Sequence, residues 1–477
     1  MNFDMIKSSS IINIVLIFSL FVGIILRLYN INYDNLWIDE MATFWVTDPS
    51  ISFKEMLDRH SSTELAPQFY YILIYFIHNI FGYSPDIGRY FSSVVGTLSI
   101  FTIGYLVKIL KDNGSYKLSI FLVSLNVFLI SYSMEMRTYM LMFFISSLSL
   151  IFIFKYFKTK KNYFLLLFFI TQVCSTFTHP FSVILFASIA ILPFYQYILR
   201  HTYEKNFIIT LVLTGISVIV IIFTYYFNLK ISSDYLWNEQ PTFKFLTNLY
   251  FSQYFGSRAL GIIHLIILLF LVFKFRIQIL KNNFLFVLLI LFILSYFIPL
   301  TYGFYKPIIT SKYIIFVLIP IIVLISVLVN ELKNKILKNF LISLIVLITI
   351  GNQFTEENFK QFFESRKHFK PQYDLALKHI NESNYKNFYV DLNFAKTDNL
   401  KRNYLLIYKN YLEFMSKRNN YNEMRYVQND QNYNSSEVWI LCSYLVYGDN
   451  CKKSLVNQTI LDERQFKNLY LTLIAID

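Results

Sequence analysis

The chain has 477 residues, of which 55% are hydrophobic and 15% are charged, and its formal net charge is +13. A soluble domain carries about 25% charged residues, so this composition excludes an ordinary soluble enzyme, and so much apolar mass excludes a disordered chain. On a soluble protein the excess of basic residues would suggest a nucleic-acid partner, but in an apolar chain it indicates the loops of a membrane protein. We therefore expect a polytopic membrane protein that binds no nucleic acid.

Eleven segments are apolar enough to cross a bilayer, whose hydrocarbon core of about 30 Å needs roughly 20 helical residues. They cover approximately residues 11–28, 86–108, 117–134, 138–157, 162–178, 181–199, 207–229, 259–277, 284–301, 312–330 and 338–354. The first continues to Arg27 without the small-residue cleavage site of a signal peptide, so we expect it to remain as an anchor. The predicted fold class is mainly α, a polytopic helical bundle with about 11 spans.

The charges of the loops predict the orientation of this bundle. With the N-terminus in the cytoplasm, the inner loops up to residue 352 carry 16 basic and four acidic residues, and every inner loop is net positive. This is the bias that the positive-inside rule describes, and an odd number of spans then leaves the C-terminus outside. A bias toward Asn, Lys, Ile and Tyr indicates an AT-rich bacterial genome. We expect an integral protein of the bacterial inner membrane.

Two outer regions are too long to be simple connectors. Residues 30–85 form a first outer loop, and residues 355–477 form a polar tail that is close to charge balance. The predicted domains are therefore a membrane domain over residues 1–354 and an extracytoplasmic domain over residues 355–477.

The tail has the sequence pattern of a small α/β domain. It contains a helical stretch at 373–381 and strand-like runs at 388–392 and 438–442. Cys442 and Cys451 lie nine residues apart in this region, in a compartment where disulfides persist. A disulfide between them and a pair of free thiols both remain open.

The first outer loop has the densest ionisable content beside the membrane. Asp39 and Glu40 follow the aromatic anchor Trp37, about ten residues beyond the first span. On a helix, neighbouring side chains diverge by about 100°, so one carboxylate can act as a base while the other holds structure or an acceptor. A solvated acidic turn is the alternative. Patterns at 53–59 and 67–82 predict juxtamembrane helices, which a site for a lipid-linked substrate would need.

Further charges lie at the outer mouths of the predicted spans. Arg89 opens the second span, Glu135 and Arg137 occupy a tight turn, His179 occupies the next outer turn, and Lys312 opens the tenth span. Snorkelling cations and a local ion pair in the tight turn are the alternative interpretations. A cationic lining beside a carboxylate favours a phosphorylated lipid carrier whose leaving group is an anion.

At these residues the sequence resembles the GT-C membrane glycosyltransferases, in particular the glycosyltransferase family 39 group of protein O-mannosyltransferases and lipid A aminoarabinose transferases. The matching motifs occur in the family's order: Leu36–Glu40, Pro67–Gly82, Ile87–Ser92 with Gly96, Tyr132–Tyr139, Thr178–Pro180, and Ser311–Tyr313 with Pro320. The resemblance extends over about residues 10–330. It implies a GT-C bundle that moves a sugar from a polyprenyl-phosphate donor, here undecaprenyl phosphate, to a glycan, lipid or protein acceptor.

The resemblance also assigns roles to residues of this chain. The reaction would be an inverting single displacement with Asp39 as the general base and Glu40 organising the loop. The donor phosphate would be bound by Arg89, Arg137, Lys312 and Tyr313. Supporting positions are Trp37, His60, Glu64, Pro67, Glu135, Tyr139 and His179.

Two positions depart from the family pattern. Ala66 stands where the family has His or Lys before the proline, and Lys312 replaces an arginine, which keeps the charge but loses the bidentate fork. A donor-phosphate or metal contact at the first position would then come from His60, Glu64 or Lys306. A divalent metal stays open, and no other cofactor is expected.

Two other functional classes remain as alternatives. An envelope polysaccharide polymerase or ligase would also use outer loops, but should lack the early Trp-x-Asp-Glu series. A secondary transporter would bury charges at mid-membrane and show internal repeats, and the sequence has neither. The sequence also lacks a Gly-rich nucleotide-binding fingerprint, in agreement with a lipid-linked donor.

Overall fold

The computed structural model describes residues 3–32, 34–64, 66–112, 114–201, 203–230, 251–305, 310–353, 370–392, 398–421, 424–427, 437–443, 458–466 and 468–475. The chain forms two compact units. Unit 1 comprises Met1–Tyr29, Leu65–Tyr70 and Arg89–Asn358, and unit 2 comprises Asn30–Glu64, Tyr71–Gly88 and Phe359–Asp477. The domain boundary expected after residue 354 stays a prediction.

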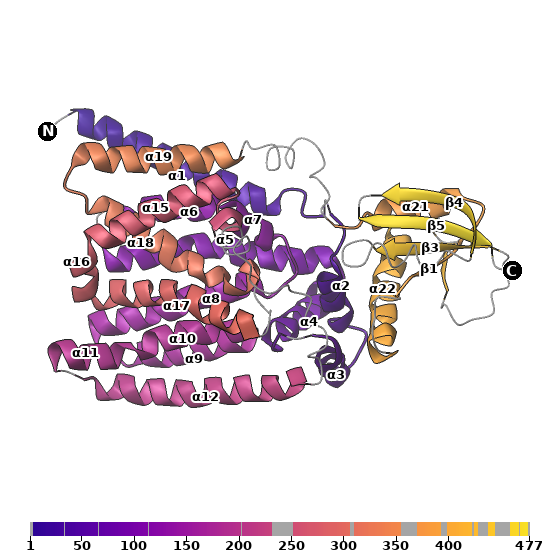
Figure 1. Ribbon diagram of the computed structural model, residues 1–477, viewed down its shortest axis with the longest axis horizontal. Coiled ribbons are helices and arrows are strands. Elements are labelled where there is room, and N and C mark those ends of the chain that lie inside the picture. The colour runs from indigo at the N-terminus through magenta and orange to yellow at the C-terminus, as the bar shows by residue number, and fades with distance from the viewer. Residues whose placement is uncertain are drawn as a thin grey trace. The chain divides into compact units, whose positions relative to one another are not determined.

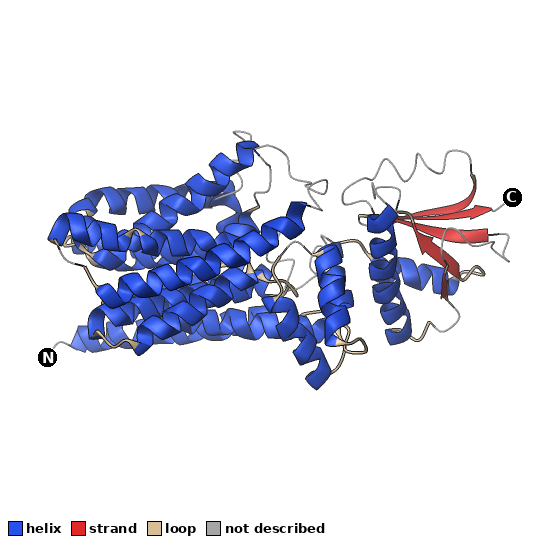
Figure 2. Cartoon of the chain, turned by 90° about the horizontal axis from the view of Figure 1, so that it is seen from below, coloured by secondary structure: helices blue, strands red, loops and turns tan. Residues whose placement is uncertain are grey.

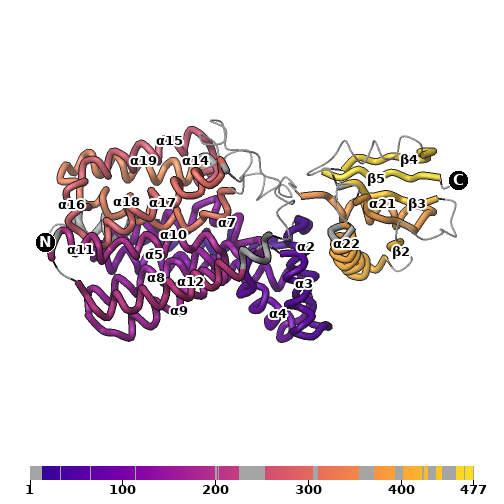
Figure 3. Tube along the Cα trace, turned by 60° about the horizontal axis from the view of Figure 1, so that its bottom comes forward, coloured from indigo at the N-terminus to yellow at the C-terminus, as the bar shows by residue number. Residues whose placement is uncertain are grey.

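Unit 1 is a helical bundle, drawn in indigo to orange in Figure 1. Its elements are α1 (Phe3–Leu28), α5 (Pro85–Leu110), α6 (Ser115–Leu125), α7 (Val127–Ser133), α8 (Tyr139–Thr159), α9 (Tyr163–Thr178), η1 (Pro180–Ser182), α10 (Val183–Ala190), α11 (Leu192–Arg200), α12 (Lys205–Lys230), α14 (Phe251–Tyr254), α15 (Arg258–Lys274), α16 (Arg276–Lys281), α17 (Asn283–Tyr305), η3 (Ser311–Val317), α18 (Leu318–Asn330) and α19 (Lys335–Gln353). Helices α8, α9 and α12 run side by side, as the trace in Figure 3 shows.

The bundle has an apolar centre and an apolar outside. The span Ser311–Asn330, which contains α18, is 89% buried, whereas the equally apolar span of α12 is only 22% buried and that of α19 only 17% buried. Exposed side chains on α12 include Ile216, Ile219 and Phe223. A surface this apolar is stable only against lipid, which agrees with a membrane protein.

The mainly α membrane bundle is confirmed, but the number of eleven spans is not. Among the described residues, seven helices are long and apolar enough to cross a membrane, or eight if the bent pair α6–α7 counts as one span. All eleven predicted segments coincide with helices. However, α9 and α15 have only 16 and 17 residues, which span about 24–26 Å at 1.5 Å per residue, less than the hydrocarbon core.

The bent pair α6–α7 is held by a buried arginine. The two helices meet at an angle of 56°, and the Asn126 side chain at the break accepts a hydrogen bond from the Leu129 N–H, which caps α7. A broken helix frees backbone carbonyls that have no water to bind inside a membrane. The guanidinium of Arg27, at the end of α1, donates to the carbonyls of Val123 and Ser124 at 2.8 Å each. Arg27 thus satisfies the last turn of α6.

Small residues let these helices approach closely. A Cβ atom on Gly23 of α1 would lie 2.5 Å from the Ser124 carbonyl oxygen, and one on Gly96 of α5 would lie 2.1 Å from the Ser133 hydroxyl. The hydroxyl of Ser93 donates a hydrogen bond at 2.7 Å to the carbonyl of Arg27, and it also lies 2.9 Å from the Ser133 carbonyl. Close backbone approach through glycine and serine is the usual means of helix association in lipid.

Unit 2 contains three short helices of the first outer loop and the α/β fold of the tail. Its elements are α2 (Ile38–Val46), α3 (Phe53–Thr63), most of α4 (Phe69–Phe81), α21 (Tyr373–Glu382), β1 (Asn387–Val390), α22 (Asp398–Arg418), β2 (Arg425–Tyr426), β3 (Glu437–Ser443), β4 (Thr459–Phe466) and β5 (Leu469–Ala475). The five strands form one sheet in the order β2-β1-β3-β5-β4. Strand β1 is parallel to β2 and β3, and β5 is antiparallel to β3 and β4. In Figure 2 the strands are confined to this unit. The small α/β fold predicted for the tail is confirmed.

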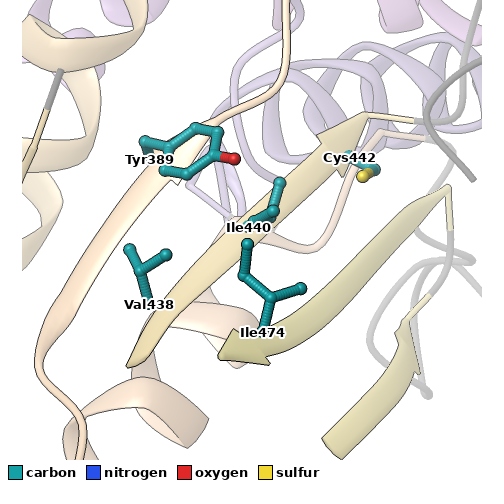
Figure 4. Close-up of a cluster of buried hydrophobic side chains, with 5 residues drawn as sticks. All are labelled: Tyr389, Val438, Ile440, Cys442 and Ile474. Atoms are coloured by element: carbon teal, nitrogen blue, oxygen red, sulfur yellow. The ribbon is translucent and has the colours of Figure 1, made fainter. Parts of the chain in front are cut away.

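The sheet is buried on both faces along β3. Val438, Ile440 and Cys442 alternate along the strand and pack with Tyr389 and Ile474, as Figure 4 shows. On the other face Trp439 is buried under α21, where its indole N–H donates to the Ser383 hydroxyl at 3.1 Å.

Cys442 is disulfide-bonded and Cys174 is free. Cys451, the predicted partner of Cys442, lies outside the described residues, so the pairing itself stays a prediction.

The first outer loop packs against the tail helix α22. The Phe44 ring stacks on Tyr83 with centroids 4.0 Å apart and meets Phe414 edge-on at 5.2 Å. The Tyr83 hydroxyl donates to the Asn410 side-chain oxygen at 2.9 Å. Residues more than 300 positions apart therefore share one core.

Replacing Arg27 tests the support of the broken helix. Arg27→Met leaves the carbonyls of Val123 and Ser124 without their donor, and each buried acceptor left unsatisfied costs about 1–3 kcal/mol. We expect a clear fall in the thermal stability of the detergent-purified protein, measured by far-UV circular dichroism. The control is Arg276→Met, which removes an exposed guanidinium that lies 4.6 Å from the Phe273 ring. Equal losses in both variants would contradict this role for Arg27.

Candidate functional site

The two carboxylates of the first outer loop lie at the N-terminus of α2 but in different environments. Asp39 and Glu40 are in the first turn, where negative charge is stabilised by the helix dipole. The Glu40 carboxylate accepts a hydrogen bond at 3.4 Å from the backbone N–H of Trp37, which precedes the helix. Glu40 is fully buried, whereas Asp39 is only partly buried. Of the two side chains, only that of Asp39 is partly accessible.

Glu40 forms a buried ion pair with the tail. The Lys370 ammonium lies 2.5 Å from a Glu40 carboxylate oxygen, and the two side chains are 6% and 0% exposed. The same ammonium lies 5.9 Å from the centroid of the Trp37 ring. Glu40 therefore connects the start of α2 to the tail.

Nothing in the sequence alone identifies Lys370 as the partner of Glu40. It lies 330 residues from Glu40, in a tail with many lysines, and no spacing rule connects the two. Only a folded structure could identify it.

The supporting residues His60 and Glu64 lie at the end of α3, and Pro67 precedes α4 in the chain. The His60 ring is buried and meets Tyr71 edge-on with centroids 4.6 Å apart. Glu64 ends α3, with its backbone N–H bonded to the His60 carbonyl, and Pro67 is buried just before α4. Among the described residues, no group of three His, Cys, Asp or Glu side chains is placed to hold a metal ion. Lys306, the third candidate for the contact missing at Ala66, lies outside those residues.

In unit 1 three predicted site residues form an aromatic triangle, which consists of Tyr139, His179 and Tyr313. They come from the start of α8, the turn after α9, and η3. The Tyr313 centroid lies 5.1 Å from that of His179 and 6.2 Å from that of Tyr139, and the last two are 6.2 Å apart. The Lys312 ammonium lies 5.3 Å from the centroid of Tyr139 and 5.9 Å from that of Tyr313, within cation–π range.

Arg137 adds a second cation to this group. It lies in the tight turn before α8, where its backbone N–H donates to the Glu135 carbonyl at 2.8 Å, and it is 8% exposed. Burial, followed by the positive charges of Arg137 and Lys312, lowers the pKa of His179 to about 3. The His179 Nδ1 accepts a hydrogen bond from the Phe181 N–H at 3.4 Å. His179 is therefore neutral, with its proton on Nε2.

We call Arg137, Lys312 and the aromatic triangle the cationic cluster. It combines two positive charges, two phenol groups and a neutral imidazole N–H, and all of its aromatic rings are partly or fully buried. Such a set of donors in a dry site favours an anionic ligand with several oxygen acceptors. The third predicted cation, Arg89, is buried in α5 of the same unit, at 2% exposure. Asp39 and Glu40 belong to unit 2.

Comparison with known proteins identifies the fold. Neither a protein-family profile nor a curated protein sequence matches the chain. Among solved structures, ArnT from Cupriavidus metallidurans in the apo state matches with a TM-score of 0.56 and 9% identity over 98% of both chains. The same protein bound to undecaprenyl phosphate matches with a TM-score of 0.51 and 10% identity, again over 98% of both chains.

A second relative comes from the archaea. The oligosaccharyltransferase AglB from Archaeoglobus fulgidus, in complex with an inhibitory peptide and a dolichol-phosphate, matches with a TM-score of 0.56 and 10% identity. The match covers 94% of this chain and 70% of AglB. The chain therefore has the fold of the GT-C membrane glycosyltransferases.

The neutral state of His179 predicts a pH dependence of stability. An unfolded histidine has a pKa of about 6.5, so between pH 6.5 and 3 the unfolded chain binds a proton that the folded chain does not. Stability is then complete above pH 6.5 and decreases as the pH falls, by about 2 kcal/mol between pH 7 and 5. In His179→Gln we expect this contribution to disappear, as measured by thermal unfolding at the two pH values. His201→Gln, at an exposed histidine, should keep the wild-type dependence.

A mutant cycle tests the buried ion pair of unit 2. Lys370→Met leaves the Glu40 carboxylate buried without its ammonium partner, which costs about 3–5 kcal/mol, and adding Glu40→Gln should restore part of that loss. Tryptophan fluorescence during thermal unfolding reports mainly on unit 2, because three of the four tryptophans, Trp37, Trp45 and Trp439, belong to it. Lys378→Met, at an exposed lysine, is the control. No recovery in the double variant would argue against coupling of the two charges.

Proposed function

We propose that this protein is an integral-membrane glycosyltransferase that moves a sugar from a polyprenyl-phosphate donor to an acceptor on the extracytoplasmic face. The observation that carries this proposal is the cationic cluster at one end of a GT-C bundle. ArnT and AglB, which share the fold, have been solved with undecaprenyl phosphate and dolichol-phosphate respectively, and this supports the same class of donor here.

The cationic cluster has the chemistry of a carrier-phosphate site. Arg137 can bind two phosphate oxygens through its planar fork, while Lys312 supplies a compact charge. The phenols of Tyr139 and Tyr313 and the Nε2–H of His179 are neutral donors. Because His179 stays neutral, it adds no third positive charge to those of Arg137 and Lys312. Arg89 is a further candidate for this contact.

Asp39 is our choice for the general base. In the proposed step, the Asp39 carboxylate accepts the proton of an acceptor hydroxyl while that oxygen forms a bond to the anomeric carbon. The bond between the anomeric carbon and the carrier phosphate oxygen breaks at the same time, and its electron pair leaves with the phosphate. Attack from the face opposite the leaving group inverts the anomeric configuration.

Glu40 has a positioning role in this proposal. Its carboxylate is paired with Lys370 and with the backbone of Trp37, so it holds the first turn of α2 in place. Asp39 is the preceding residue and is directed away from Glu40 by about 100° around the helix axis. A rigid Glu40 therefore fixes the direction of the base.

The charge bias of the loops supports an orientation with the N-terminus in the cytoplasm of a bacterial cell. Both Asp39 and the tail would then lie outside the inner membrane. The acceptor would be a glycan, a lipid or a protein that reaches this side.

Replacing Asp39 tests the catalytic assignment. Asp39→Asn keeps the shape of the side chain but removes the base, so turnover should fall by about 10²–10⁴-fold with little change in donor affinity. The assay uses purified protein with a defined undecaprenyl-phosphate sugar and a membrane-lipid or glycan acceptor. Asp58→Asn, at an exposed carboxylate in α3 of the same unit, is the matched control. Near-normal turnover in Asp39→Asn at equal expression would refute this role.

The cations should give a different kinetic signature. A hydrogen bond to a charged group contributes about 1.5–3 kcal/mol, so Arg137→Gln and Lys312→Met should each raise the donor concentration for half-saturation by about 10–100-fold. Lys108→Met, at the other end of unit 1, should leave saturation unchanged. If donor saturation is unaltered in both cluster variants, the cationic cluster does not bind the donor.

A further inference from the structure

A polar cavity lies at the opposite end of unit 1 from the cationic cluster. Its volume is about 810 Å³, which is in the range of small-molecule sites. Helix α8 joins the two regions, because it begins at Tyr139 in the cluster and reaches the cavity at Phe157 and Lys158. Its 21 residues span about 30 Å, the thickness of a hydrocarbon core. In Figure 1, α11 and α16 mark the end of unit 1 where the cavity lies. It is therefore separate from the proposed donor site.

The cavity wall is strongly basic. Lys158, Lys160, Lys274 and Lys281 line it together with one acidic residue, Glu204, so the lining has a net charge of +3. Glu204 forms its ion pair with Lys160, at the rim. The lining thus has more basic than acidic side chains.

The remaining polar lining consists of amide side chains. Gln196 of α11, Gln278 of α16, and Asn282 and Asn283 before and at the start of α17 all face the cavity. Each amide can donate two hydrogen bonds. Ammonium and amide donors together match an anion with several oxygen acceptors, such as a phosphodiester.

Exposed apolar side chains adjoin this polar cavity. Ile277 lines it and is exposed, and Phe273 and Leu280 lie on the same helices, α15 and α16. On α11 the side chains of Phe194 and Tyr197 are exposed as well. In a membrane, such a surface contacts acyl chains. A soluble phosphate would fill only the polar cavity. A phospholipid would fill the cavity with its headgroup and cover the apolar surface with its acyl chains.

We propose that this cavity binds the phosphodiester headgroup of an anionic phospholipid, with the acyl chains along Phe273 and Ile277. Basic pockets between membrane helices on the cytoplasmic side bind such headgroups, and the predicted orientation places this end of unit 1 inside. The site goes beyond the proposed transfer reaction, because its ligand is a lipid of the opposite leaflet and not the sugar donor.

Lipid titrations followed by native mass spectrometry test the proposal. The full-length protein in detergent is titrated with phosphatidylglycerol, phosphatidylcholine or glycerol 3-phosphate. We expect saturable binding of phosphatidylglycerol only. The double variant Lys274→Gln/Lys281→Gln should weaken it by about 30-fold, since each lysine near a membrane surface contributes about a fivefold factor. Lys274→Arg/Lys281→Arg, which preserves the charge, should bind almost normally.

The control has the same change of charge on the same side of the bundle. Lys333→Gln/Lys335→Gln alters two exposed lysines before and at the start of α19, outside the cavity, and should change affinity by less than about twofold. Equal weakening in both Gln pairs would overturn the proposal in favour of general surface charge. Displacement by glycerol 3-phosphate, equal binding of phosphatidylcholine, or loss of binding in the Arg pair would also overturn it.

Discussion

The need to satisfy backbone groups inside a membrane governs the architecture of unit 1. Helix α6 breaks at Asn126, and a break in lipid is tolerated only where other groups replace the missing hydrogen bonds. The Arg27 guanidinium does so by donating to Val123 and Ser124, and it is itself fully buried. Helix α7 then leads directly to the tight turn that carries Glu135 and Arg137. The position of Arg137 thus depends on a second buried cation, Arg27 at the end of α1.

The cationic cluster places two cations, Arg137 and Lys312, beside a histidine that stays neutral. Arg137 is buried and Lys312 is partly buried, and a histidinium beside them would add a third positive charge that repels both. Burial and the two cations keep His179 neutral by lowering its pKa to about 3. Lys312 supplies a compact ammonium charge, which lies 5.3 Å from the centroid of the Tyr139 ring and 5.9 Å from that of Tyr313.

Unit 2 unites the first outer loop with the tail, although more than 300 residues separate them in sequence. Phe44 and Tyr83 from the loop pack on α22, and Glu40 pairs with Lys370. The tail therefore supplies the Lys370 ammonium, which holds Glu40 and with it the start of α2. In the proposed mechanism, this makes the orientation of Asp39 dependent on the tail. It also offers a route by which the tail could influence acceptor choice.

The sequence by itself determined the membrane bundle, the small α/β fold of the tail and the ordered motifs of the GT-C resemblance, because apolar run length, strand alternation and local spacing are properties of neighbouring residues. It also predicted Tyr139, His179, Lys312 and Tyr313 as site residues, and the structure brings these together. It could not determine the number of spans, since α9 and α15 are short and α6–α7 is bent. Nor could it find Lys370 or the role of Arg27. Their partners lie 330 and about 100 residues away, and only tertiary packing selects one buried partner among many charged residues.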